Sequence, residues 1–189
     1  MAAIQTTPET QALPVPGTWT LDTTHTDVSF TARHLMVTKV RGRFPVIEGA
    51  VTIAENPLES SVVAVIDVAG VNSGEAGRDE HLRNADFFDV EKYPTMTFRS
   101  TKVEASRGGD YKLTGDLTIK DVTRPVTLDL EYLGTIASPF GDTRAGFSAS
   151  TEISRKDWGL EWNMALEAGG VVVGDKIKLN IDAETILQK

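Results

Sequence analysis

Apolar and polar residues alternate with a period of two along most of the chain from residue 18 onward. This period places successive side chains on opposite faces of a β-strand. In residues 176–184, apolar side chains occupy every second position: Ile177, Leu179, Ile181 and Ala183. An earlier run predicts that four residues share the apolar face of another strand: Ile47, Gly49, Val51 and Ile53. The pattern predicts many short strands, each with one dry face.

Turn signals separate the predicted strands. Residues 55–57, 107–110 and 139–142 contain Gly, Pro, Asn or Asp, which favour turns. Serial hairpins can close into a barrel and so remove the unpaired edges of an open sheet. We expect an all-β fold, an extended antiparallel barrel of about eight strands, with a two-sheet sandwich as the alternative. Such a barrel can hold one small ligand, or inward aromatic side chains can fill it: Phe30, Phe98 and Phe147.

Residues 78–100 interrupt the alternation with a cluster of charged and aromatic side chains. We expect a short helical insertion near residues 79–92. Asp86 precedes Asp89 by three residues, which is typical of an N-terminal helix cap. The helical turn then presents two aromatic side chains, Phe87 and Phe88. An insertion of this kind favours a mouth or lid on a β scaffold.

The charged residues of this insertion admit two interpretations. Singly, each fits a salt-bridged surface turn. Together they fit a polar collar around a ligand head group, since ligand pockets combine apolar walls with a few orienting polar groups. The residues concerned are Arg78, Glu80, His81 and Arg83.

Two further segments depart from a simple strand pattern. Residues 157–162 contain Trp158 and Trp162, which fit either the mouth of a barrel or a capped core. Residues 62–68 are apolar on both faces. A dimer contact, or packing beneath a loop or the N-terminal tail, explains the second pattern equally well, because large exposed apolar patches are unusual.

Composition narrows the class of protein. The 189 residues fit one domain, residues 18–189, preceded by a flexible tail at residues 1–17 that is rich in Thr, Gln and Pro. A formal net charge of −8 opposes nucleic-acid binding, which needs clustered cations. No apolar run approaches the roughly 18 residues of a transmembrane helix. We therefore expect a protein without a transmembrane segment or a nucleic-acid partner.

The N-terminus indicates a location. Residues 1–17 contain no Lys or Arg and no apolar core of a secretory signal. We expect a cytoplasmic protein, or a periplasmic or secreted one if the N-terminus was processed. The chain has no Cys, which excludes disulfides, thiolate metal ligands and a Cys nucleophile.

Candidate catalytic chemistry is sparse. His25, His34 and His81 lie nine and forty-seven residues apart, unlike the tight His pairs of zinc sites. No Gly-x-Ser-x-Gly elbow and no phosphate-binding Gly-rich loop is present. We expect no catalytic residue, no metal and no cofactor. A hydrolase or isomerase acting on a small amphipathic substrate, with these histidines as acid–base groups, is the alternative, and a stress-related structural module is a third.

Several motifs together resemble the YceI-like family, the lipocalin-like polyisoprenoid-binding proteins. The most specific matches are residues 78–83 (RDEHLR), 86–89 (DFFD) and 93–98 (YPTMTF). Weaker matches are residues 19–22, 25–30, 33–35, 40–44, 115–119 and 122–126, with Arg155, Asp157 and Gly159. Asp121, Trp158 and Thr26 depart from the usual family residues. The resemblance covers nearly the whole chain after the tail.

The resemblance implies a lipocalin-like barrel that encloses an elongated apolar channel. Its ligand would be an amphipathic isoprenoid lipid, polyprenyl or quinone-like, bound without turnover, often in a homodimer. We expect the ligand-binding wall to consist of Phe30, Phe44, Phe87, Phe88, Met96, Phe98, Leu117, Ile119, Phe147, Trp158, Ile177 and Leu179. We expect the head-group collar to consist of Arg78, His81, Arg83 and Arg155.

Overall fold

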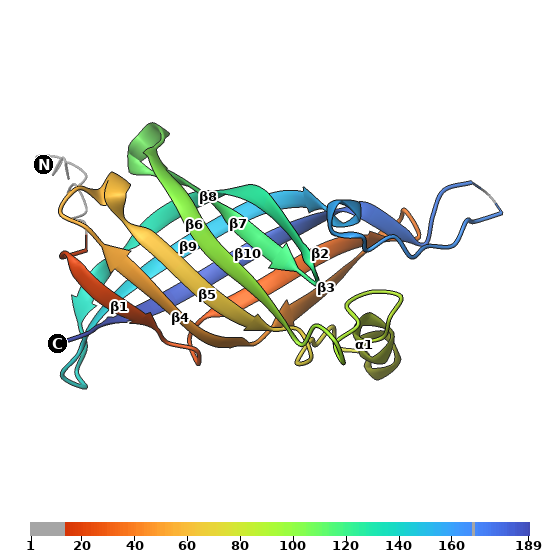
Figure 1. Cartoon of the computed structure of the whole chain (residues 1–189), viewed down its shortest axis with the longest axis horizontal. Helices are drawn as coiled ribbons and strands as arrows, with labels where there is room; N and C mark the ends of the chain where they lie inside the picture. Colours follow the sequence, from red (N-terminus) through yellow and green to blue (C-terminus); the bar gives the residue numbers. More distant parts are fainter. Residues whose placement is uncertain (1–13, 168) are drawn as a thin grey trace, which may run out of the picture.

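The computed structural model describes residues 14–167 and 169–189, which form one antiparallel sheet that closes on itself (Figure 1). The strands are β1 (Gly17–Leu21), β2 (Asp27–His34), β3 (Thr38–Phe44), β4 (Val46–Ile53), β5 (Ser61–Asp67), β6 (Thr95–Ala105), β7 (Tyr111–Ile119), β8 (Val122–Ala137), β9 (Thr143–Ser154) and β10 (Val173–Leu187). The helices are α1 (Ala76–Arg83) and the 3-10 turns η1 (Pro57–Glu59), η2 (Arg107–Gly109) and η3 (Arg155–Trp158).

The sheet closes because β10 is long enough to pair with both pieces of a broken strand. It pairs with β2 along its first half and with β1 near its end, while β1 also pairs with β4. A second broken strand consists of β3 and β4, which only Pro45 separates. Proline has no backbone N–H to donate to a neighbouring strand. Counting each broken pair as one strand gives a closed eight-stranded antiparallel barrel. The predicted fold is confirmed.

The alternation of the sequence maps onto the wall of the barrel, with one interruption. Along β10, Ile177, Leu179 and Ile181 all face the interior. In β4 the predicted face is wrong at its first residue, because the pairing with β5 shifts register between Val46 and Glu48. Such a bulge changes the face on which the side chains lie. Val46 therefore points inward, and Ile47 is 51% exposed on the outside.

The helical insertion begins and ends earlier than predicted. The N-cap of α1 is Glu75, whose carboxylate accepts from the backbone N–H groups of Gly77 and Arg78. Asp86 is not a helix cap, since its carboxylate pairs with the His81 ring (Nε2 to Oδ2, 2.9 Å). Irregular turns follow α1 up to residue 92.

The strand with two apolar faces lies in the wall. Val62, Ala64 and Ile66 of β5 face the interior. On the outer face Val63 and Val65 are half-buried between their cross-strand neighbours on β4 and β6: Ala50 and Arg99 for Val63, Glu48 and Thr97 for Val65. Neighbouring side chains thus cover part of this face.

The first residues of the described chain already contact the barrel. Residues 1–13 of the predicted tail lie outside the described residues. Pro14 lines the interior, the Val15 carbonyl accepts from the indole N–H of Trp19 (3.1 Å), and Gly17 begins β1. No helix among the described residues is long and apolar enough to span a bilayer.

Candidate ligand-binding cavity

A cavity of about 280 Å³ lies inside the barrel, and side chains from every strand line it. It reaches the end of the barrel near η1, where Pro57 and Ser60 line it, and the end near α1, where Leu160 and Val173 do. All the predicted wall residues except Trp158 are among the lining residues: Phe30, Phe44, Phe87, Phe88, Met96, Phe98, Leu117, Ile119, Phe147, Ile177 and Leu179. Eleven of the twelve predicted wall residues therefore line the cavity, and their role in binding a ligand stays a prediction.

The wall also contains apolar residues beyond the predicted ones. They lie on the same strand faces as the selected ones, so the period-two pattern itself was the available signal. The additional apolar residues include Leu21, Val51, Val103, Leu113, Leu128 and Ala149. The wall is almost entirely apolar, and apolar cavities accept apolar guests.

Two glycines make room for aromatic rings in the wall. A Cβ atom on Gly42 would lie 2.5 Å from the ring of Phe30, its cross-strand partner. A Cβ atom on Gly115 would lie 2.4 Å from the ring of Phe98. Glycine within a strand often marks a close approach of this type. The rings lie over these positions and form part of the cavity surface.

The segment after α1 closes the interior at one end. Phe87 and Phe88 are buried, and the Phe88 ring contacts Phe44 edge-on, with centroids 5.5 Å apart. The His81 ring packs edge-on against Phe87 and Trp162, at 5.0 and 4.5 Å. His81 thus supports the aromatic wall from behind and does not itself line the cavity.

The arginines of the predicted collar bond to the protein itself. Arg78 donates from Nε and Nη2 to the hydroxyl and carbonyl of Ser73, at 2.8 and 2.9 Å. Arg83 donates to the carbonyls of Ala69 and Val71, at 2.7 and 2.8 Å. Both guanidinium groups tie α1 to the segment after β5. Neither residue lines the cavity.

Arg155 does line the cavity, but its guanidinium N–H groups already donate to protein acceptors. It is 3% exposed, and burial lowers the pKa of its guanidinium while the nearby Asp175 raises it. A guanidinium has five N–H donors, and the structure gives this one five acceptors within 3.5 Å. They are the carbonyls of Leu160, Trp162, Val173 and Gly174 and the carboxylate of Asp175. Arg155 therefore fastens the segment after η3 to β10.

Trp158 packs behind the wall. It is 2% exposed, and its indole N–H donates to the carbonyl of Leu117 (3.0 Å). Trp158 and Leu160 both belong to the main hydrophobic core. Of the two interpretations drawn from the sequence, the capped core describes its position.

Known proteins resemble this chain in sequence and in fold. The model of the YceI-like domain matches residues 19–185. The chain belongs to the YceI-like family. Protein YceI of Escherichia coli is 37% identical over 166 residues, which cover 87% of this chain and 83% of that protein. The resemblance drawn from the motifs is confirmed.

Solved structures share the YceI-like barrel. Burkholderia cenocepacia BcnA superposes with a TM-score of 0.74 at 21% identity, over 87% of this chain and 98% of that one. A polyisoprenoid binding domain from Saccharophagus degradans, implicated in plant cell wall breakdown, superposes with a TM-score of 0.68 at 18% identity, over 90% and 98% of the two chains. At these identities the comparison concerns the fold.

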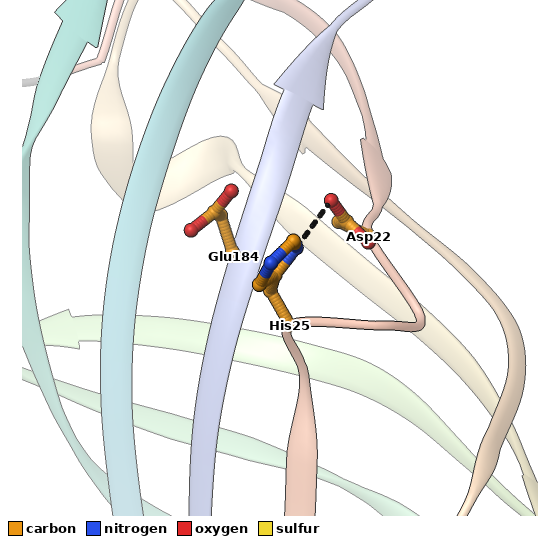
Figure 2. A group of neighbouring side chains, drawn as sticks. All are labelled: Asp22, His25 and Glu184. Atoms are coloured by element: carbon orange, nitrogen blue, oxygen red, sulfur yellow. Dashed lines mark hydrogen bonds and ion pairs between the residues drawn. The ribbon is translucent and has the colours of Figure 1, made fainter. Parts of the chain in front are cut away.

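A polar cluster lies on this YceI-like barrel at the break between β1 and β2. Figure 2 shows Asp22 and His25 joined by a hydrogen bond (2.9 Å), with Glu184 of β10 beside them. Arg144 of β9 pairs with Asp22 (2.9 Å), with Glu184 and with Asp142 (3.0 Å). Three carboxylates thus share one guanidinium, which already bonds to Asp22 and Glu184, two of the three groups that could hold a metal ion. We propose no metal there.

Hydrogen bonding sets the charge states of this cluster. Hydrogen bonds from Thr24 and then from His25 lower the pKa of Asp22, against the opposing effect of burial. The bond to Asp22 and its negative charge raise the pKa of His25. The cluster therefore favours an ionised Asp22 beside a protonated His25.

The three histidines do not converge on one site. His25 lies in the polar cluster, His34 ends β2, and His81 packs against the aromatic wall. None of them lines the cavity among the residues that the structure describes. The arrangement gives no support to a shared acid–base site.

Proposed function

We propose that this protein binds an amphipathic isoprenoid lipid, polyprenyl or quinone-like, in the central cavity and carries or sequesters it without turnover. The observation behind the proposal is a cavity that reaches both ends of a closed barrel and has an almost wholly apolar wall. A hydrocarbon tail fits such a space because each buried methylene contributes about 0.8 kcal/mol. Ordering of the chain offsets part of this gain.

The chemistry of the wall favours binding over turnover. Among the described lining residues there is no His, Asp, Glu or Lys, and the guanidinium of Arg155 is held by protein acceptors. The titratable groups that remain are the phenols of Tyr111 and Tyr132, and the Tyr132 hydroxyl pairs with that of Thr135. General acid–base catalysis needs a titratable group within hydrogen-bond reach of the reacting atom. A ligand inside this cavity would meet mainly methyl, methylene and aromatic groups.

The family supports the choice of ligand class. The structure from Saccharophagus degradans is described as a polyisoprenoid binding domain, and its barrel superposes on this one. Isoprenoid tails carry a methyl branch on every unit, and aliphatic and aromatic side chains from every strand line the cavity that would hold them. Because the predicted collar arginines bond to the protein, we infer that selection acts on the tail and that the head group lies at an end of the barrel.

A direct test blocks the cavity from within. Ala149 lines the cavity on β9, and Ser150, the next residue, does not. Purified protein with Ala149→Phe should bind geranylgeraniol about tenfold more weakly than the parent protein, since the ring occupies ligand space. The matched variant Ser150→Phe adds the same ring outside and should bind within about twofold of the parent.

Two readouts complete this test. Tryptophan fluorescence titration gives the affinity, and native mass spectrometry with organic extraction identifies lipid that co-purifies. Failure of the parent protein to bind geranylgeraniol and to carry any lipid would contradict the proposal. Equal binding by Ala149→Phe and Ser150→Phe would place the ligand outside the cavity.

Homodimerisation and a cytoplasmic location stay predictions. The half-buried outer face of β5, with Val63 and Val65, offers an apolar surface for a second copy. Its strand neighbours already cover part of that surface.

A further inference from the structure

The turn between β2 and β3 exposes three consecutive apolar side chains. Leu35, Met36 and Val37 are 39%, 47% and 81% exposed. The backbone N–H of Val37 donates to the carbonyl of His34 (3.1 Å), which makes a tight turn with Leu35 and Met36 at its central positions, within a three-residue loop between the paired His34 and Thr38. We call these three residues the apolar tip. Tight hairpin turns normally carry Asn and Gly, so its composition needs an explanation.

The backbone of the apolar tip is strained. The φ angles of Leu35 and Met36 are +49° and +63°, in the left-handed region. A turn with positive φ at both central residues suits Asn-Gly, whereas bulky side chains lose stability there. Such outliers concentrate at functional sites. The chain therefore keeps two large apolar side chains at a position where they cost folding stability and lie in solvent.

The turn between β2 and β3, which carries the apolar tip, lies at the α1 end of the barrel, opposite the C-terminus (Figure 1). The backbone N–H of Leu35 donates to the carbonyl of Val172 (2.9 Å). The residue before the tip, His34, pairs with Val173, which lines the cavity. Met164, 58% exposed, accepts from the N–H of Val172 and extends the apolar surface. The tip thus adjoins one end of the cavity.

Cations flank the apolar tip. Residues 28–47 contain four cations and no carboxylate in a chain of net charge −8. The four are exposed, and cross-strand pairing places Arg33 beside Lys39, with the others further along β3: Arg41 and Arg43. None of them forms an ion pair with a carboxylate of residues 14–167 or 169–189. Lys178 of β10, opposite Thr31, adds a fifth cation one strand away. We call these five residues the basic face.

The basic face has a simpler explanation that accounts for only part of the pattern. β3 ends the run of paired strands next to β2, and exposed Lys or Arg protects such an edge from pairing with another chain. Edge protection does not require Leu35 and Met36 in a strained turn. A basic face next to exposed large apolar residues is the combination that binds at a lipid interface.

We propose that the apolar tip docks on an anionic phospholipid surface. The apolar tip enters the interface, and Arg33 and Lys39 contact the lipid phosphates. The proposal goes beyond ligand binding in the cavity and does not depend on it, although docking here would place one end of the cavity at the membrane.

The opposite end of the barrel provides a control. The β8–β9 turn exposes Phe140 to 85%, but its neighbour Asp142 is acidic and Arg144 is held by carboxylates. This turn has an apolar side chain without available cations. An anionic surface should therefore select the apolar tip and not this turn.

Flotation with vesicles tests the proposal. The parent protein should bind vesicles of mixed phosphatidylglycerol and phosphatidylcholine, and binding should fall as salt increases. The double variant Leu35→Asn, Met36→Gly supplies the residues that the turn favours, so it should fold at least as stably and yet lose about tenfold in vesicle binding. Arg33→Gln and Lys39→Gln should each lose about fivefold. Phe140→Asn should bind like the parent.

The outcomes separate docking from ligand binding. Equal vesicle binding by the parent and the double turn variant, or equal binding to pure phosphatidylcholine, would overturn the proposal. So would loss of binding in Phe140→Asn. Each variant is also titrated with geranylgeraniol in the absence of vesicles. A parent protein that binds geranylgeraniol but no vesicle refutes docking alone, and one that binds vesicles but no geranylgeraniol refutes only the proposed ligand.

Discussion

At the scale of single residues, the shape of the cavity depends on positions that have no side chain. A Cβ atom on Gly115 would lie 2.4 Å from Phe98 Cζ and 2.6 Å from the carbonyl oxygen of Arg99. The ring can shift, but the backbone oxygen belongs to the neighbouring strand and cannot move without disturbing the pairing of β6 with β7. The absence of a side chain at residue 115 is therefore a structural requirement.

Gly115→Ala should lower the free energy of unfolding by about 1–3 kcal/mol, because the added methyl group overpacks the wall. Gly146→Ala is the matched control on β9. Its Cβ atom would lie 3.5 Å from the Leu133 side chain, an ordinary contact, so stability should change by less than about 0.5 kcal/mol. Denaturant unfolding measures both. Equal effects of the two substitutions would refute the steric explanation.

At the scale of elements, the polar cluster fixes the break between β1 and β2 to the strands beside it. Asp22 contacts His25 and Arg144, and Arg144 also holds Asp142 and Glu184. The break therefore depends on charge states. A protonated His25 bonds to Asp22, and Glu184 adds to the rise in the pKa of His25 while Arg144 opposes it.

The sign of the pH dependence follows from these shifts. The pKa of His25 is raised in the folded protein, so its stabilisation is complete below about pH 6.5 and is lost as pH rises through the raised value. Asp22 has a lowered pKa, so its contribution is present above about pH 4 and is lost only in stronger acid. The unfolding free energy of the parent should thus fall relative to that of His25→Gln as pH rises above about 6.5.

Two measurements check this prediction. Denaturant unfolding across the pH range compares the parent with His25→Gln, and NMR titration follows the imidazole directly. In Asp22→Asn the pKa of His25 should return towards about 6.5. A pKa of His25 that is the same in the parent and in Asp22→Asn would show that Asp22 is not the cause.

Elements with a regular period could be predicted from the sequence, and irregular ones could not. The alternation located Ile177, Leu179 and their counterparts because a strand repeats every two residues. The predicted face of Ile47 is wrong because a bulge changes the face on which a side chain lies, without a clear sequence signal. The prediction of Asp86 as a helix cap is wrong because a carboxylate can equally well pair with a histidine, here His81.

In the candidate site, too, the sequence predicts some features and not others. Apolar wall residues follow from periodicity, whereas the partners of a charged side chain depend on which loops meet in three dimensions. Arg78, Arg83 and Arg155 were expected to hold a head group, and the structure pairs them with backbone carbonyls of nearby loops. Trp158 was expected in the wall and lies behind it, bonded to Leu117.

At the scale of the whole molecule, the barrel depends on a short seam. β1 and β10 share three residue pairs, Trp19 with Leu187, Thr20 with Ile186 and Leu21 with Thr185. Trp19 is fully buried and packs with Val51, Tyr132 and Ala145 at the end of the barrel near the C-terminus. Because few backbone pairs close this end, side-chain packing around Trp19 supplies much of the closure.

Trp19→Ala should therefore open the seam as well as lower global stability. We expect a loss of about 3–5 kcal/mol, the usual cost of truncating a buried Trp. Hydrogen–deuterium exchange should rise most in β1 and at residues 185–187, since local opening follows local packing. Trp158→Ala, equally buried near the α1 end, is the matched control. It should cost a similar free energy, with its largest rise in exchange near η3 and β7. If both variants raise exchange at the seam equally, closure depends on the whole core and not on Trp19.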